Sequence, residues 1–438
     1  MLHPIVIALL AVGILTIWLV QRRYVLVAFL VLAVLIPLQQ QIVVAGAHMI
    51  VMRIVLLCAW VRLLHRMLSG SEFLAGGLRP LDKIVIAWTL SAVVTYTLQW
   101  QTMGALINRM GMLFTVFGTY FLLRHLVRTV ADIDRLFATF AFLCAVIAVL
   151  MIVEQATRHN MLADFGALAQ PEIRNGRIRS QGPFQHPIIA GTFAATMSPI
   201  FFGLWWSRRA RPVAAVGLMA ATIMAVTSGS STPILGYAAG ALALCMWGIR
   251  NHMRAVRWAI VLVLLSLHMV MKAPVWALIG RIDILSGSTS WHRFELVNQF
   301  INRFGEWWLL GTRSNASWGT DMWDTVNGYV AAGISGGIAG LVLFIAIIVY
   351  AFKAVGRTLR SNCSGSKQRF CWSLGAALFA NCMAFFGIAY FDQSVIFWYA
   401  LLATILATAS DTVEEHVAAP ARGIYPRNWV QLNPLQSS

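Results

Sequence analysis

The sequence predicts an all-α polytopic membrane protein of 12 or 13 transmembrane helices with two large loops on one side. Of its 438 residues, 59% are hydrophobic and only 11% are charged, and the mean hydropathy is +0.74. Soluble domains do not have this balance. Two further observations agree: apolar runs long enough to span a bilayer recur along the chain, and basic residues gather in the connectors of one side.

The apolar runs begin close to the N-terminus. We expect the first run to be a retained span and not a signal peptide, because no Lys or Arg precedes it and no small-residue cleavage site follows it. The runs that predict spans are 3–20, 24–45, 46–63, 84–101, 103–123, 136–154, 188–206, 213–227, 232–249, 257–272, 326–352, 371–390 and 394–409.

The formal net charge of +17 would suggest a nucleic-acid partner in a soluble protein. Here most of the 33 Lys and Arg residues fall in connectors of one side, such as 62–83, 124–135 and 353–369. The positive-inside rule accounts for such a bias, so no nucleic acid is expected. The same rule places the C-terminus in the cytoplasm.

The six cysteines lie in spans or a cytoplasmic loop, and we expect a bacterial inner membrane.

We expect residues 1–409 to form a single integral membrane domain. The polar segment 410–438 is expected to be a disordered cytoplasmic tail. Two outward loops, at about 155–187 and 273–325, are too long for simple turns. The second is expected to contain amphipathic helices that lie on the bilayer, anchored by tryptophans. A polar turn, SGSST at 228–232, interrupts the helices and is expected to line a cavity, where backbone at membrane depth is tolerated.

Arginines supply the first candidate site. Arg174, Arg177 and Arg179 lie together in the first outward loop, and a guanidinium matches phosphate oxygens bidentately. The alternative is that these side chains extend to lipid headgroups, as arginines at a membrane edge do. Arg109 falls inside an apolar run, where an unpaired charge costs roughly 2.5–3.5 kcal/mol. We therefore expect Arg109 to be used or paired.

Other polar residues mark the points where the chain returns into the bilayer. His186 is either a hydrogen-bonded turn residue or a base, and His292 is either oriented by Glu295 or simply paired with it. Asp324 precedes a span, where it either caps the helix or acts as a general base. The glycines of 328–340 indicate close helix packing. No metal-spaced His and Cys set is apparent, and no cofactor is expected.

Four sequence motifs occur in this order along the chain: RSQGPFQHPIIAGTFAA, SGSSTPILGYAAG, HRFELVNQFINRFGEWWLLG and DTVNGYVAAGISGGIAGLVLF. Together, over about residues 174–350, they resemble the O-antigen ligase and O-antigen polymerase family of bacterial surface-polysaccharide enzymes. The resemblance implies a GT-C-like fold. It also implies metal-independent glycosyl transfer at the periplasmic face, from an undecaprenyl-pyrophosphate-linked glycan to a glycan or lipid acceptor, with membrane lipid around the helices.

The resemblance also implies roles for individual residues. Arg293 and Asp324 are the expected catalytic residues. Asp324 would be the base in place of a histidine that the family uses; the alternatives are that the reaction needs no strong base or that the activity has changed. The arginines expected at the donor pyrophosphate are Arg109, Arg177, Arg179 and Arg293. The residues expected at the glycan or the cavity wall are His186, Asn327 and Tyr329.

One departure from the family pattern bears on the reaction. The family's histidine in its His-Asn-x-Tyr motif, the proposed base of the ligases, falls on Val326. Its absence favours a polymerase-like exopolysaccharide enzyme over a lipopolysaccharide ligase.

A protein of a different class fits some of the same features. A transporter or flippase of a lipid-linked or anionic amphiphilic substrate would also need broken helices and arginines around a cavity at mid-depth. Such a protein usually has an inverted repeat, whereas this chain shows none and both large loops face one side. A non-catalytic scaffold of a polysaccharide assembly complex is a third possibility.

Overall fold

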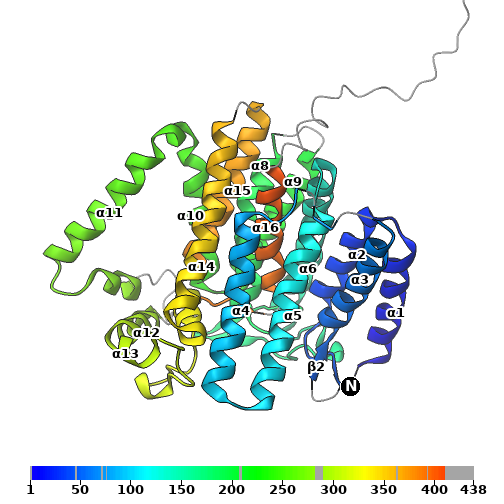
Figure 1. Ribbon diagram of the computed structural model, residues 1–438, viewed down its shortest axis with the longest axis horizontal. Helices are drawn as coiled ribbons and strands as arrows, with labels where there is room; N and C mark the ends of the chain where they lie inside the picture. The colour runs from blue at the N-terminus through cyan, green and yellow to red at the C-terminus, as the bar shows by residue number, and fades with distance from the viewer. Residues whose placement is uncertain are drawn as a thin grey trace, which may run out of the picture.

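The computed structural model describes residues 2–44, 47–70, 73–74, 76–206, 210–281, 290–361, 364–391 and 393–409, which are mostly helical. Figure 1 shows the long helices running side by side in one bundle. The helical segments of this part that are long and apolar enough to cross a membrane are Pro80–Trp100, Met103–Leu126, Val130–Thr157, Pro187–Leu204, Ser231–Val270 and Gly328–Arg360. This agrees with the predicted helical membrane class. The number of 12 or 13 crossings stays a prediction, and the tail 410–438 lies outside the described residues.

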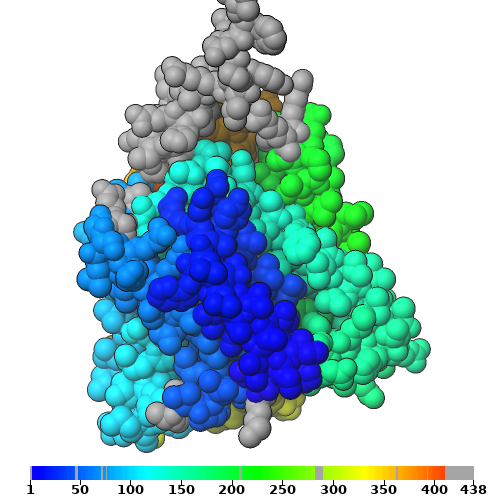
Figure 2. Space-filling view, turned by 90° about the vertical axis from the view of Figure 1, so that its right-hand side faces the viewer, coloured from blue at the N-terminus to red at the C-terminus, as the bar shows by residue number. Residues whose placement is uncertain are grey.

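The N-terminal helices lie on one side of the bundle, where Figure 2 shows them in dark blue on the surface. Two apolar runs, 24–45 and 46–63, were expected to be helical throughout, and this is wrong at their adjoining ends. The ends pair as antiparallel strands, because the β-branched side chains in QIVV favour extended backbone. The elements are α1 (Pro4–Leu19), α2 (Arg22–Leu35), β1 (Gln41–Val44), β2 (Ala47–Ile50) and α3 (Val51–Leu68).

The next three helices are α4 (Pro80–Trp100), α5 (Met103–Leu126) and α6 (Val130–Thr157). A buried polar cluster joins α4 to α5. Asp82 accepts hydrogen bonds from the Tyr120 hydroxyl at 2.6 Å and from the Arg124 guanidinium at 3.1 Å. Because a buried charge is stabilised only when it is paired, these residues fix how the two helices pack.

The following helices are interrupted. The run expected at 188–206 is two helices, with a bend between them, and the SGSST turn separates two more. The elements are α7 (Pro187–Ala195), α8 (Ser198–Leu204), α9 (Arg211–Thr227), α10 (Ser231–Cys245) and α11 (Met253–Val270). Every residue of α11 is at least partly exposed, and Figure 1 shows this helix standing apart from the bundle.

The second long loop carries short helices that lie near one end of the bundle (Figure 1). They are α12 (Ser290–Asn302) and α13 (Phe304–Trp307), and after them come α14 (Gly328–Arg360), α15 (Gly365–Ala384) and α16 (Ser394–Thr408). Nearly every residue of α16 is buried. It packs against α5, α7, α14 and α15, so it is a central helix of the core.

Helix α14 is broken at Gly337, which has φ 62° and ψ −161°. The preceding loop fills the gap: the Thr312 amide donates to the Ile334 carbonyl, and the Ile338 amide donates to the Trp308 carbonyl. A broken helix at membrane depth needs such partners for its freed backbone groups. The break therefore fastens the segment that carries α12 and α13 to the helix bundle. The glycines were expected to serve close packing, and Gly337 has this further role.

Candidate functional site

The first long loop, at about 155–187, contains a tight β-hairpin made of β3 (Glu172–Arg174) and β4 (Arg177–Arg179). Its two-residue turn, Asn175-Gly176, has φ values of 50° and 73°, as a type I′ turn requires. The register places Glu172 opposite Arg179. Because side chains alternate along a strand, the charged residues of both strands share one face of the hairpin.

Arg179 is the best anchored of the candidate arginines. Only 2% of its surface is exposed. Its guanidinium donates to Glu172 Oε1 at 2.6 Å and to the hydroxyl of Ser230. Glu172 also pairs with Arg174 at 3.1 Å. The hairpin thus holds a buried guanidinium beside a carboxylate that is about one third exposed.

Arg293 comes to the same place from a different segment. It lies on α12 with 7% of its surface exposed, and its Nη2 donates to Thr232 Oγ1 at 3.0 Å. Ser230 and Thr232 flank the first residue of α10. Two guanidiniums from separate loops therefore meet at the first turn of one helix. That turn carries unpaired backbone N–H groups and partial positive charge, the usual setting for an anion.

The start of α10 is held by contacts that sequence patterns do not show. The Gln155 side-chain amide donates to the carbonyls of Ile178 and Thr227, which ties the hairpin to the end of α9. Gly229 has φ 56°, and a Cβ there would lie 2.9 Å from Cγ of Arg179. Only glycine combines this backbone conformation with room for the arginine.

His186 is the N-cap of α7. Its Nδ1 accepts the Ile188 backbone N–H at 3.1 Å, so the ring proton of the neutral imidazole lies on Nε2, which is 3.7 Å from Glu172 Oε2. Burial lowers the pKa of His186 below its ordinary value of 6.5, and the charge of Arg179 lowers it further, against the opposing effects of Glu172 and Asp324. The Nε2 atom of His186 therefore faces the Glu172 carboxylate, which also accepts a hydrogen bond from Arg179.

Asp324 is exposed, and it is close enough to His186 to influence the pKa of that imidazole. Its backbone carbonyl lies 3.1 Å from His292 Nε2. The alternative that Asp324 caps the following helix is wrong. Asn327 is the N-cap of α14, because its side-chain oxygen accepts the backbone N–H groups of the two residues that follow Gly328.

Asn327 and Tyr329 use their polar atoms inside the protein. Asn327 is 1% exposed, and its amide also donates to the carbonyl of Phe386. The Tyr329 hydroxyl donates to the carbonyl of Cys382 at 3.0 Å. These contacts orient the start of α14. Val326, at the family's histidine position, packs against the small apolar core formed by α12, α13 and α14.

The two remaining arginines lie outside this network of contacts. The Arg109 guanidinium lies 3.5 Å from the centroid of the Tyr96 ring and contacts the sulfur of Met112, within the α4–α5 pair. Cation–π pairing of this kind stabilises a desolvated charge. Arg177 is exposed near the hairpin turn. The structure thus brings together Arg179, Arg293, His186 and Asp324, and it joins neither Arg109 nor Arg177 to them.

Glu172 was missing from the residues expected at the site. The signal for it was present in EIRNGRIR, because Asn-Gly between alternating residues predicts a two-residue hairpin whose register pairs Glu172 with Arg179. With Arg174, Arg179 and Arg293, the site holds three guanidiniums, two of which pair with the Glu172 carboxylate. Within the described ranges, no group of three or more His, Cys, Asp or Glu could hold a metal ion.

This arrangement is suited to an anionic group with several oxygens, because the donors approach from two loops and a helix end. No protein-family model matches the chain, and no curated protein matches it in sequence. The resemblance to the O-antigen ligase and polymerase family therefore depends on the four sequence segments alone.

Proposed function

We propose that the protein is a membrane glycosyltransferase that transfers or polymerises glycan from an undecaprenyl-pyrophosphate donor. In this proposal the reaction takes place at the periplasmic face of a bacterial inner membrane, the C-terminus is cytoplasmic, and the chain crosses 12 or 13 times. One observation carries the proposal: two buried arginines, Arg179 and Arg293, reach the N-cap and first turn of α10 from two separate loops.

The proposed chemistry matches this cluster. The acceptor hydroxyl oxygen bonds to the anomeric carbon of the donor sugar, and the bond from that carbon to the phosphate oxygen breaks. Negative charge grows on the departing undecaprenyl pyrophosphate. Fixed guanidiniums shielded from water stabilise such charge without having to reorganise. Asp324, the exposed carboxylate nearby, takes the proton of the acceptor hydroxyl.

Glu172 has a defined place in this scheme. Its carboxylate satisfies Arg179 in the substrate-free protein, where an unpaired buried guanidinium would be costly. The donor pyrophosphate takes over as the anion at Arg179, and Glu172, already one third exposed, turns toward solvent. The Nε2–H of His186 is then placed to donate to a phosphate or sugar oxygen. Arg177 meets the donor only at the outer edge of the hairpin, and we assign no pyrophosphate contact to Arg109.

The decisive experiment is turnover by the purified full-length protein in nanodiscs. The protein is incubated with an undecaprenyl-pyrophosphate-linked oligosaccharide, and both the release of undecaprenyl pyrophosphate and the lengthening of the glycan are followed by mass spectrometry. We expect both products to form in the presence of EDTA. If the oligosaccharide instead crosses the bilayer of proteoliposomes chemically unchanged, the protein is a transporter or flippase, and the proposal is wrong.

A further inference from the structure

Tryptophans of the second long loop differ in burial. Trp307 and Trp318 are 3% and 2% exposed, and their indole N–H groups donate hydrogen bonds within the same loop. Trp291 and Trp323 are 70% and 69% exposed. The first two therefore belong to the small apolar core around α12 and α13, whereas packing within the protein does not account for the second two.

The two exposed tryptophans, Trp291 and Trp323, lie beside a single contact between distant segments. Nε2 of His292 lies 3.1 Å from the Asp324 carbonyl oxygen, and each tryptophan directly precedes one member of this contact in the chain. The centroid of the Trp291 ring is 5.1 Å from that of Phe294, which limits how the indole can turn. Two large apolar rings from segments 32 residues apart are thus placed next to Asp324.

The surroundings of Trp323 are polar. This ring lies in the chain between Asp321 and Asp324, which are both exposed, and carboxylates are costly within a bilayer. Burial in lipid, the ordinary reason for an exposed tryptophan in a membrane protein, therefore does not account for it. Exposed apolar surface that is rimmed by polar groups commonly marks a binding site.

The chemistry around the two rings matches a sugar better than the other parts of a lipid-linked substrate. A sugar ring has an apolar face of C–H groups and a rim of hydroxyls, so indoles contact the face while carboxylates accept hydrogen bonds from the hydroxyls. A polyprenyl chain offers no donor to Asp321 or Asp324, and a pyrophosphate would be repelled by both carboxylates. In the proposed reaction, the group that must come to Asp324 is a hydroxyl of the acceptor glycan.

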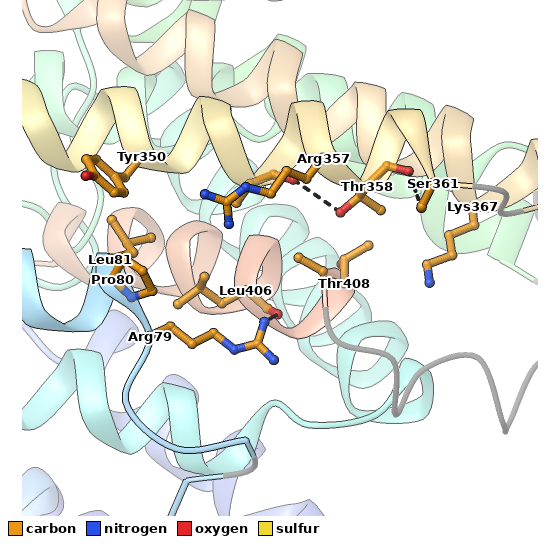
Figure 3. A pocket seen from close by; sticks show the side chains of 12 residues that line it. Arg79, Pro80, Leu81, Tyr350, Arg357, Thr358, Ser361, Lys367, Leu406 and Thr408 are labelled. Carbon is orange, nitrogen blue, oxygen red and sulfur yellow. Dashed lines mark hydrogen bonds between the residues drawn. The ribbon is translucent and has the colours of Figure 1, made fainter.

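A cavity of about 260 Å³ at the other end of α14 does not compete for this ligand (Figure 3). Arg357 lines that cavity, and about 45 Å of helix separates it from Asn327 at 1.5 Å per residue. Figure 3 shows Arg79 on the opposite side of the space, where its Nη1 donates to the Leu406 carbonyl at 3.1 Å. That contact joins the start of α4 to the end of α16, and the cavity is too far from Asp324 to hold a sugar that reacts there.

We infer that Trp291 and Trp323 bind sugars of the acceptor glycan next to the hydroxyl that reacts. The inference rests on the proposed function for the choice of the acceptor as the ligand. Binding of a glycan to the two rings can nevertheless be measured without any reaction, so the two proposals can fail separately.

The test uses the full-length protein in nanodiscs. The probe is the free oligosaccharide that mild acid releases from the undecaprenyl-pyrophosphate-linked oligosaccharide. Its binding is titrated by calorimetry for wild type, W291A/W323A and W291F/W323F. The matched control, W258A/W308A, removes two indoles that are 61% and 45% exposed, one on α11 and one directly after α13. Tryptophan emission is also recorded with brominated phosphatidylcholine in the nanodisc, because bromine quenches indoles that lie in the bilayer.

We expect W291A/W323A to weaken binding by about 10–100-fold, from about 3–10-fold for each aromatic contact. W291F/W323F keeps two rings and should retain most of the binding, and the control should bind as wild type does. The inference is overturned if wild type does not bind the oligosaccharide, or if W291A/W323A binds it as tightly as wild type. It is also overturned if the bromolipid quenches the emission that W291F/W323F removes, because the rings would then be membrane anchors. Absence of turnover with glycan binding as expected would contradict the proposed function alone.

Discussion

Replacing Arg179 by Gln tests the arginine cluster most directly. Arg179 is 2% exposed and donates to Glu172 and Ser230, so its loss removes a charged donor from the first turn of α10. Removing one preorganised donor from a developing oxyanion typically costs about 10²–10³-fold in kcat. Stability should fall less than for a fully buried pair. Because the Glu172 carboxylate is one third exposed, water can solvate it once Arg179 is gone. We therefore expect R179Q to lower the free energy of unfolding by about 1–3 kcal/mol.

The assay separates catalysis from folding through a double-mutant cycle. E172Q, R179Q and E172Q/R179Q are compared for oligosaccharide turnover and for unfolding temperature in the same detergent. We expect the double variant to recover much of the stability lost in R179Q, because no unpaired carboxylate remains, and to recover none of the turnover. R174Q is the matched control. Arg174 also pairs with Glu172, but it is 40% exposed, so turnover should fall by less than about fivefold.

Recovery of turnover in E172Q/R179Q would refute the assignment. In that case Arg179 would serve only to neutralise Glu172, and removing both charges would leave the reaction intact. Wild-type turnover in R179Q alone would refute it equally. Loss of turnover in both Arg179 variants, with the unfolding temperature lowered in R179Q and largely restored in E172Q/R179Q, is the result that agrees with a phosphate contact.

Three further predictions follow from the geometry. D324N should lower turnover by about 10²–10⁴-fold if Asp324 is the base. The control D321N, at another exposed carboxylate of the same loop, should leave turnover unchanged. Full activity of D324N would exclude Asp324 as the base. The pKa of His186 is lowered on folding, so the unfolded chain takes up its proton first and stability falls as pH drops below 6.5. H186N keeps an N-cap acceptor and should lose less unfolding temperature than wild type between about pH 7.5 and about pH 5.5; an equal loss would contradict this. G337A should lower the free energy of unfolding by about 2–4 kcal/mol, because φ is 62° there and a Cβ would lie 2.4 Å from the Leu309 carbonyl oxygen. The control G356A, on the same helix, should leave it unchanged. The unfolding temperatures of the two variants test this.

Much of the helical layout could be predicted because apolar runs and turns are local signals. The SGSST turn separates α9 from α10 where the pattern predicted it. The hairpin at 41–50 was missed because its strands are as apolar as the spans they join, and hydropathy does not distinguish a short strand from a helix end. The N-cap of α14 was missed by three residues, since Asp324 and Asn327 are both good caps and only the backbone geometry decides between them.

The arginine cluster could be predicted only in part, for a physical reason. Hydropathy and residue type place Arg179 and Arg109 alike at the outward side of apolar runs. What separates them is the partner: Arg109 lies against the ring of Tyr96, whereas Arg179 reaches the start of α10. Tyr96 and Arg109 lie at similar distances from the connector between two consecutive runs, whereas the turn that Arg179 reaches is 51 residues further along the chain, so only tertiary contacts place Arg179. Glu172 is the exception, because the hairpin register that pairs it with Arg179 is local.

The two arginines of the cluster are positioned by different means. Arg179 belongs to a hairpin tied to α6 and α9 through Gln155, and it is thereby part of the bundle. Arg293 belongs to α12, which is held by stacking of Phe300 on Trp307 at 3.8 Å and, through the loop after α13, by the break in α14. A shift of this outer unit would separate the guanidiniums without changing either loop. The break at Gly337 is thus as important to the geometry of the cluster as the arginines themselves.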